Sequence, residues 1–279
     1  MYFRPYLLLQ YAIALSNVHG EISYFIELNC TKTHRLITPL FLYVCKRMNT
    51  NHIDSNQAMR QKQLGPAKIV GLFLLILLPL YFFGNLAEDV IKKEVFFFDN
   101  PVLLFMHQHA TPSLDMVMAF FSRIGSAKVL IPFNILVFLF LLFKKYWNQS
   151  LFWAAAVCGA ALLNLLAKHA FARVRPDLWL SILPETTFSF PSGHAMQSMA
   201  VGCGLVALLW ETRWRNRILF IAVPFVVAVG VSRIYLGVHY PSDILAGWSA
   251  SFAWVVGLRA LFVHLHKKLL PIPVGTGQP

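Results

Sequence analysis

Three short polar stretches interrupt an otherwise apolar chain, and their residue types suit phosphate chemistry. They are "KHAFARVRP" (168–176), "PSGH" (191–194) and "SRIYLGVHYPSD" (232–243). A phosphoryl group needs several fixed donors for its charged oxygens, a nucleophile for phosphorus and an acid for the leaving oxygen. The three stretches contain cations, two histidines and an aspartate, so they predict a phosphoryl-transfer site if they meet in space.

Three cations are the candidates for holding the phosphate oxygens. Lys168 supplies a point charge, whereas Arg175 and Arg233 supply planar forks that can donate two hydrogen bonds at once. Pro176 pushes Arg175 out of helical geometry, so that this arginine can reach sideways from a helix end. Any one of these cations, taken alone, is more typical of an anchor at a membrane boundary. We expect the three cations to bind phosphate together because all of them belong to the three polar stretches that also contain the two histidines and the aspartate.

Two of the stretches are typical of helix starts. Proline stands before Ser192 and at position 241, and a serine next to such a proline can cap the helix. The free N–H groups and positive dipole of a helix start also attract phosphate. Gly193 lets the backbone approach an anion closely. We therefore assign Ser192 and Gly193 to phosphate binding, with a purely structural capping role as the alternative.

The two histidines fit the roles of nucleophile and acid. Asp243 stands four residues after His239, where its carboxylate can accept a hydrogen bond from one ring nitrogen. That bond would leave the other nitrogen free to attack phosphorus. His194 would then protonate the leaving oxygen and later take a proton from water. Fixed cations occupy the places that a divalent ion would take, so we expect no metal and no cofactor.

The elements that position these residues are predicted to be membrane helices. The chain is 57% hydrophobic and only 13% charged, which is too little polar surface for one soluble globule. A span needs about 20 apolar residues. We mark six blocks, at 69–87, 126–143, 150–167, 192–210, 218–232 and 244–263. The prediction is an all-α integral membrane protein, a six-helix bundle whose three polar stretches lie on one membrane face.

The distribution of lysine and arginine gives the orientation. The side that carries both termini has slightly more of them, and the opposite side owes three of its cations to the phosphate-binding set. We therefore expect both termini in the cytoplasm and the site on the outer, periplasmic face of a bacterial inner membrane. The net charge of +12 then faces anionic lipid headgroups, and no nucleic-acid partner is predicted.

Residues 1–66 differ from the rest of the chain. We expect them to be a poorly structured tail, and Met48 and Met59 are alternative starts of the protein. The six-helix domain is predicted over 67–268, and a short carboxy-terminal tail over 269–279. The apolar stretch 95–109 is too short to span, so it either lies along the outer surface beside the site or packs as a buried loop.

The motifs resemble those of the type 2 phosphatidic acid phosphatase superfamily. Lys168 is separated by six residues from Arg175-Pro176, "PSGH" follows, and Ser232-Arg233 precedes a histidine and an aspartate at the family's spacing. The resemblance covers about residues 67–265. It implies a six-helix membrane lipid phosphatase without a metal, with an outward-facing site. The residues that it implies are a phosphohistidine at His239, an acid at His194, and phosphate binding by Lys168, Arg175, Ser192, Gly193 and Arg233.

The substrate class follows from the expected place of the site. A site at the bilayer surface suits a phosphate whose lipid tail stays in the membrane, and the resemblance suggests undecaprenyl diphosphate, phosphatidylglycerol phosphate or phosphatidic acid. A lipid phosphotransferase with the same phosphohistidine is the first alternative. A non-catalytic lipid transporter is the second, but binding alone would not need His194 and His239.

Overall fold

The computed structural model describes residues 66–94 and 96–266, and the regular elements of this part of the chain are all helices. They are α4 (Pro66–Ile91), α5 (Asp99–Gln108), α6 (Pro112–Ile124), α7 (Ala127–Phe143), α8 (Trp147–Phe171), α9 (Gly193–Leu209), α10 (Arg215–Tyr235) and α11 (Pro241–His266). The predicted tails lie outside the described residues, except for Pro66.

Each of the six predicted blocks forms a helix, but not all six helices have the length of a membrane span. Among the described residues, α4, α8, α10 and α11 are long and apolar enough to cross a bilayer. The pair α6 and α7, bent by 43° at their junction, adds a fifth candidate if it is one broken span. Helix α9 has 17 residues, a rise of about 26 Å, which is short for a core of roughly 30 Å. Six spans remain a prediction.

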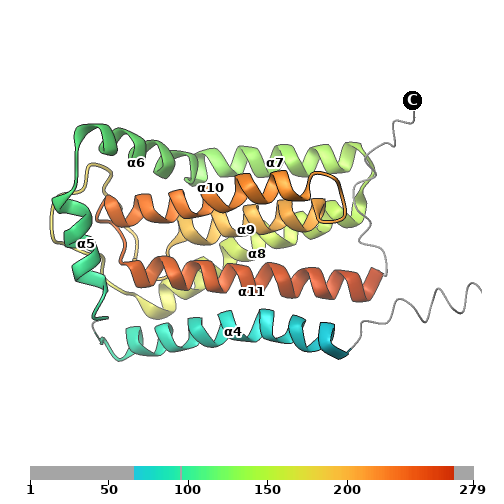
Figure 1. Ribbon diagram of the computed structural model, residues 1–279, viewed down its shortest axis with the longest axis horizontal. Helices are drawn as coiled ribbons and strands as arrows, with labels where there is room; N and C mark the ends of the chain where they lie inside the picture. The colour runs from blue at the N-terminus through green and yellow to red at the C-terminus, as the bar shows by residue number, and fades with distance from the viewer. Residues whose placement is uncertain (1–65, 95, 267–279) are drawn as a thin grey trace, which may run out of the picture. The chain divides into compact units, whose positions relative to one another are not determined.

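Helix α9 lies at the centre of the packing. It contacts α8, α10 and α11, and α11 in turn packs along α4 (Figure 1). The largest buried cluster includes Phe152 and Trp153 of α8, Val201 of α9 and Val255 of α11. Small residues allow the helices to approach: a Cβ atom on Gly230 would lie 2.3 Å from the ring of Trp248. This close packing fixes the helix ends that carry the polar stretches.

Among the described helices, α4 has the most exposed large apolar side chains. Its side chains Phe73, Leu78 and Tyr81 are 60%, 60% and 72% exposed. Apolar surface of this extent suits contact with lipid tails. Pro79 lies inside α4 and Pro132 lies inside α7, and both helices continue through the proline.

Helix α5 crosses the end of the bundle at which α10 ends and α11 begins (Figure 1). Its residues Asp99 and Leu103 are fully buried, and Leu103 packs with Ala195 and Ile244. Phe97, just before the helix, is 89% exposed. The stretch around α5 therefore combines the two expected arrangements, because one face is buried and the other is open.

Candidate active site

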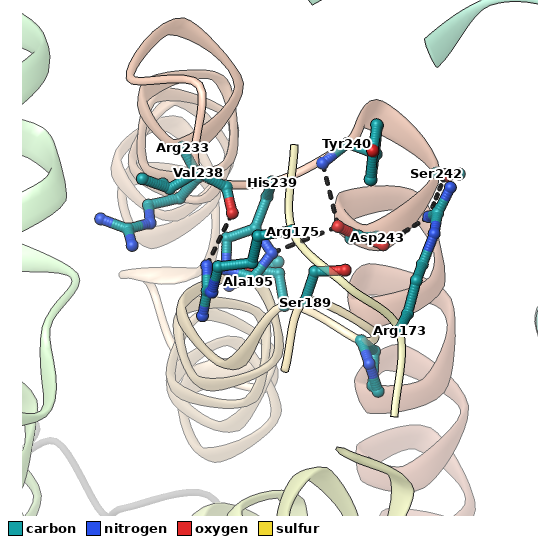
Figure 2. A network of polar contacts seen from close by, with 12 residues as sticks. Arg173, Arg175, Ser189, Ala195, Arg233, Val238, His239, Tyr240, Ser242 and Asp243 are labelled. Carbon is teal, nitrogen blue, oxygen red and sulfur yellow. Dashed lines mark hydrogen bonds and ion pairs between the residues drawn. The ribbon is translucent and has the colours of Figure 1, made fainter. Parts of the chain in front are cut away.

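The three polar stretches meet at one end of the bundle, as the sequence predicts. Arg175, in the loop after α8, donates from Nη1 to the carbonyl of Val238 at 2.6 Å. The backbone N–H of Ser192, before α9, donates to the carbonyl of Asp243 in α11 at 3.1 Å. The first bond, which Figure 2 shows, ties the first stretch to the third, and the second bond ties the second stretch to the third.

His239 lies in the turn between α10 and α11 and is 1% exposed. Its Nδ1 lies 3.3 Å from Oδ2 of Asp243, and its Nε2 lies 3.1 Å from Nη1 of Arg175. The turn depends on Gly237, whose φ of +70° is left-handed and whose added Cβ would come within 2.5 Å of Trp179. This turn places the imidazole between a carboxylate and a guanidinium.

The neighbours of His239 define its tautomer. A guanidinium can only donate hydrogen bonds, so Nε2 of His239 must be the acceptor from Arg175. The proton of the neutral ring is then on Nδ1, facing Asp243. Burial, followed by the positive charges of nearby cations, holds the pKa of His239 well below the ordinary value of 6.5. The ring is therefore neutral at pH 7, with a lone pair on Nε2.

The three predicted phosphate-binding cations gather around the loop 172–192. Lys168 donates to Oγ1 of Thr187 at 2.8 Å, and Arg175 donates from Nε to the carbonyl of the same residue at 2.5 Å. Arg233 donates to Oγ of Ser122 and, at 2.6 Å, to Oε1 of Glu185. Its Nε is buried without a partner among the described residues. This unpaired donor accords with the predicted role of Arg233 in phosphate binding.

Glu185 is a site residue that the sequence analysis missed. Its carboxylate pairs with Arg233 and interacts electrostatically with Lys168 and Arg175. A carboxylate among three cations competes with the negative oxygens of a phosphate for the same cations. A single acid in an irregular loop gives no sequence signal for this placement.

We expect Glu185→Gln to tighten inhibition by vanadate about fivefold, the effect of about 1 kcal/mol for a partly exposed pair. Glu185 is 32% exposed, and removing its charge removes a competitor for Arg233. The concentration of vanadate for half inhibition measures the effect. Glu211→Gln is the matched control, because Glu211 lies 4.0 Å from Arg259 in another acid–arginine pair. Weaker inhibition in Glu185→Gln would mean that the acid organises the site.

The "PSGH" stretch forms the start of α9. Ser192 is the N-cap, and its Oγ accepts a hydrogen bond from the N–H of Ala195 at 3.5 Å, so the expected capping is confirmed. A Cβ atom on Gly193 would lie 3.0 Å from Oδ1 of Asn164. Asn164, on α8, also donates to the carbonyl of Pro191 at 2.9 Å. This asparagine, which the sequence analysis missed, holds the turn in place.

His194 is the second residue of α9 and is half-buried. It is close enough to His239, Arg233, Lys168 and Arg175 to interact electrostatically with all four. The structure therefore places both histidines with the three cations, and it leaves their separate roles as predictions. Within residues 66–94 and 96–266, no group of three His, Cys, Asp or Glu side chains is arranged to hold a metal ion.

A second ion-pair network, also missed by the sequence analysis, lies behind His239. Arg173 donates to Asp243 at 2.6 Å and to Asp99 of α5 at 2.8 Å (Figure 2 shows the first contact). Arg173 stands two residues before Arg175 and is not one of the three cations that the motifs assign to the site. No spacing linked Asp99 to the motifs, because more than 70 residues separate it from Arg173.

Known proteins resemble this chain over the region that carries the site. The profile of the PAP2 superfamily matches residues 149–267. Phosphatidylglycerophosphatase B of Bacillus subtilis (strain 168) is 34% identical over 145 residues, which cover 50% of this chain and 70% of that protein. An undecaprenyl-diphosphatase of Sulfolobus acidocaldarius is 31% identical over 183 residues, covering 63% and 81% of the two chains.

A solved structure resembles the fold. It is the crystal structure of a transmembrane PAP2-type phosphatidylglycerolphosphate phosphatase from Bacillus subtilis. The TM-score is 0.60 at 25% sequence identity, and the match covers 71% of this chain and 99% of the solved one.

Proposed function

This chain belongs to the PAP2 superfamily, and from that premise we propose that it hydrolyses a lipid phosphate through a phosphohistidine at His239. The relatives are named as enzymes that act on phosphatidylglycerol phosphate or undecaprenyl diphosphate. The substrate class is therefore a phosphomonoester or diphosphate of a membrane lipid. The protein is a phosphoric ester hydrolase of the membrane.

The observation that carries this proposal is the pair of contacts on the two ring nitrogens of His239. Asp243 faces Nδ1 and Arg175 donates toward Nε2, so the ring keeps its lone pair on the nitrogen beside the phosphate-binding cations. A substrate phosphate would take over the donors of Arg175 and release that lone pair. An imidazole poised in this way is a nucleophile and not only a ligand for an anion.

The proposed reaction has two steps. In the first, the lone pair on Nε2 of His239 forms a bond to phosphorus, and the bond to the leaving oxygen breaks as His194 gives that oxygen a proton. In the second, His194 takes a proton from water, whose oxygen attacks phosphorus, and the phosphorus–nitrogen bond breaks. Lys168, Arg175 and Arg233, together with the start of α9 at Ser192 and Gly193, stabilise the charge on the other oxygens.

The distribution of charge along the helices supports a site on the outer face. Helix α9 runs from the site to Leu209, and α10 runs back from Arg215, so the turn between them lies at the other end of the bundle. Arg213 lies in this turn and arginines 215 and 217 lie in the first turn of α10, where Arg217 lies 4.7 Å above the ring of Trp214. Tryptophan is enriched at both membrane interfaces, whereas an excess of arginine in short loops is typical of the cytoplasmic side. We propose six spans, cytoplasmic termini and a site on the periplasmic side of an inner membrane.

The test is phosphate release by the purified protein in detergent from phosphatidylglycerol phosphate, undecaprenyl diphosphate and phosphatidic acid. Glycerol 3-phosphate, which has no lipid tail, is the control substrate. We expect release from at least one lipid phosphate, much slower release from the control, and unchanged rates in excess chelator, because fixed cations replace a metal.

Two results would contradict the proposal. One is an activity that is lost in chelator and restored by magnesium. The other is transfer of the phosphate to an added acceptor lipid in place of release to water, which would identify a phosphotransferase.

A further inference from the structure

Asp99 is a buried carboxylate far from the sequence motifs. It lies at the start of α5 and is 0% exposed. Its Oδ1 accepts from the backbone N–H of Ser242 at 2.9 Å, and its Oδ2 accepts from Oγ of Ser242 at 2.6 Å and from Nη2 of Arg173 at 2.8 Å. A buried charge with this many partners has one fixed position. Asp99 therefore joins α5 to the start of α11 and to the loop after α8.

Arg173 links this carboxylate to Asp243. Its Nη1 donates to Oδ1 of Asp243 at 2.6 Å and to Oγ of Ser242 at 2.7 Å, while Nη2 is held by Asp99. The guanidinium also lies 4.2 Å above the ring of Tyr240. Two carboxylates and an aromatic face hold the fork in one plane.

The two carboxylate oxygens of Asp243 have different partners. Oδ1 is bound to Arg173, and Oδ2 faces Nδ1 of His239 at 3.3 Å while accepting from the N–H of Tyr240 at 2.9 Å. A carboxylate that could rotate would present its oxygens to the imidazole in many orientations. Arg173, held by Asp99, fixes Oδ1, and together with the N–H of Tyr240 on Oδ2 it limits rotation of the carboxylate that faces His239.

We infer that Asp99 and Arg173 are positioning residues, which aim the His239–Asp243 pair from α5 without touching the substrate. The inference rests on the proposed function, in which His239 is the nucleophile. Arg173 differs from the phosphate-binding arginines because carboxylates hold both of its Nη atoms. The guanidinium of Arg175 instead donates to backbone carbonyls and neutral side chains. Loss of Asp99 should therefore affect the chemical step and leave substrate binding intact.

The test is Asp99→Asn in the full chain, assayed with the lipid phosphate that the wild type hydrolyses fastest. We expect kcat to fall by about 10- to 100-fold, the range known for outer partners that orient a functional histidine. KM should stay within about twofold, because the phosphate-binding cations keep their places. Asp115→Asn is the matched control: Asp115 accepts from the hydroxyl of Tyr235 at 2.7 Å and also joins a short helix to a later one. Its kcat should not change.

A double-mutant cycle separates positioning from general stabilisation. If Asp99 acts through Asp243, adding Asp99→Asn to Asp243→Asn should lower kcat no further. The inference would be overturned if Asp99→Asn lowered kcat by the same factor in the wild type and in Asp243→Asn. A raised KM with unchanged kcat would overturn it as well. If Asp99→Asn does not fold, Arg173→Lys provides the same cycle, because lysine keeps the charge but cannot hold both carboxylates in a fork.

The inference and the proposed function fail in different ways. If the wild type forms no phosphohistidine, the proposed function is wrong. If the wild type forms it and Asp99→Asn, or Arg173→Lys in its place, forms it at the wild-type rate, only the positioning role is wrong.

Discussion

His239→Ala is expected to abolish phosphate release, with a loss in kcat of about 10⁴-fold or more, as for other catalytic nucleophiles. Asp243 and Arg175 contact the two ring nitrogens of His239 and hold its lone pair beside the cations. No leaving group can compensate, because the first bond to phosphorus never forms. Steady-state release from both a lipid phosphate and an aryl phosphate measures the effect.

The matched control for that variant is His169→Ala. His169 follows Lys168 near the end of α8 and is exposed. Its removal should leave the rate unchanged, which would show that the loss in His239→Ala is not a general effect of removing an imidazole at this end of the bundle. Substantial hydrolysis of the aryl phosphate by His239→Ala would assign the nucleophile to another residue.

His194→Ala is expected to slow the hydrolysis of lipid phosphates by about 10²- to 10⁴-fold, the usual contribution of a general acid. An alkoxide leaving group needs a proton, whereas a nitrophenolate departs without one. The first step with nitrophenyl phosphate should therefore survive as a burst of nitrophenol. The phosphoenzyme should then accumulate, because the half-buried ring that would activate water is gone.

The comparison between the two histidine variants assigns their roles. His239→Ala should show neither the burst nor the phosphoenzyme. Asp243→Asn should lie between the two histidine variants, because the ring of His239 remains but its tautomer is no longer enforced. If His239→Ala keeps the aryl burst and His194→Ala loses it, the assignment of nucleophile and acid is reversed.

The sequence predicted the helices that position the site, because long apolar blocks and proline or serine helix starts are local signals. The start of α9 at Gly193, capped by Ser192, and the start of α11 at Pro241 lie where these signals place them. The predicted limits of some helices were too narrow. Predicted block 150–167 is helical from Trp147 to Phe171, because polar residues at a membrane boundary continue a helix while lowering its hydropathy.

The bend between α6 and α7 shows a second limit of the apolar pattern. The block at 126–143 was marked as a complete span, but α6 precedes it and meets it at 43°. Helix α6 mixes polar with apolar residues, with Thr111 as its cap and Pro112 in its first turn. A search for continuous apolar length does not detect a helix of this kind.

The side chains that surround the motifs were not predictable, because they come from distant parts of the chain. Asp99 meets Ser242 across 143 positions, Asn164 meets Pro191 across 27, and Glu185 meets Arg233 across 48. Nothing in the local sequence of these residues distinguishes them from ordinary surface polar groups. Only the packing of α5, α8 and the loop 172–192 against the helix starts brings them to the site.

The measurement that most directly tests the phosphohistidine is a rapid-quench trap of the phosphoenzyme during turnover of a labelled lipid phosphate. Quenching in base preserves phosphohistidine, and peptide mapping locates the label. The account predicts a phosphoryl group on Nε2 of His239, the nitrogen that faces the cations. The label should be base-stable and acid-labile, and more abundant in His194→Ala. A label on His194, or no label while phosphate is released in a single turnover, would contradict it.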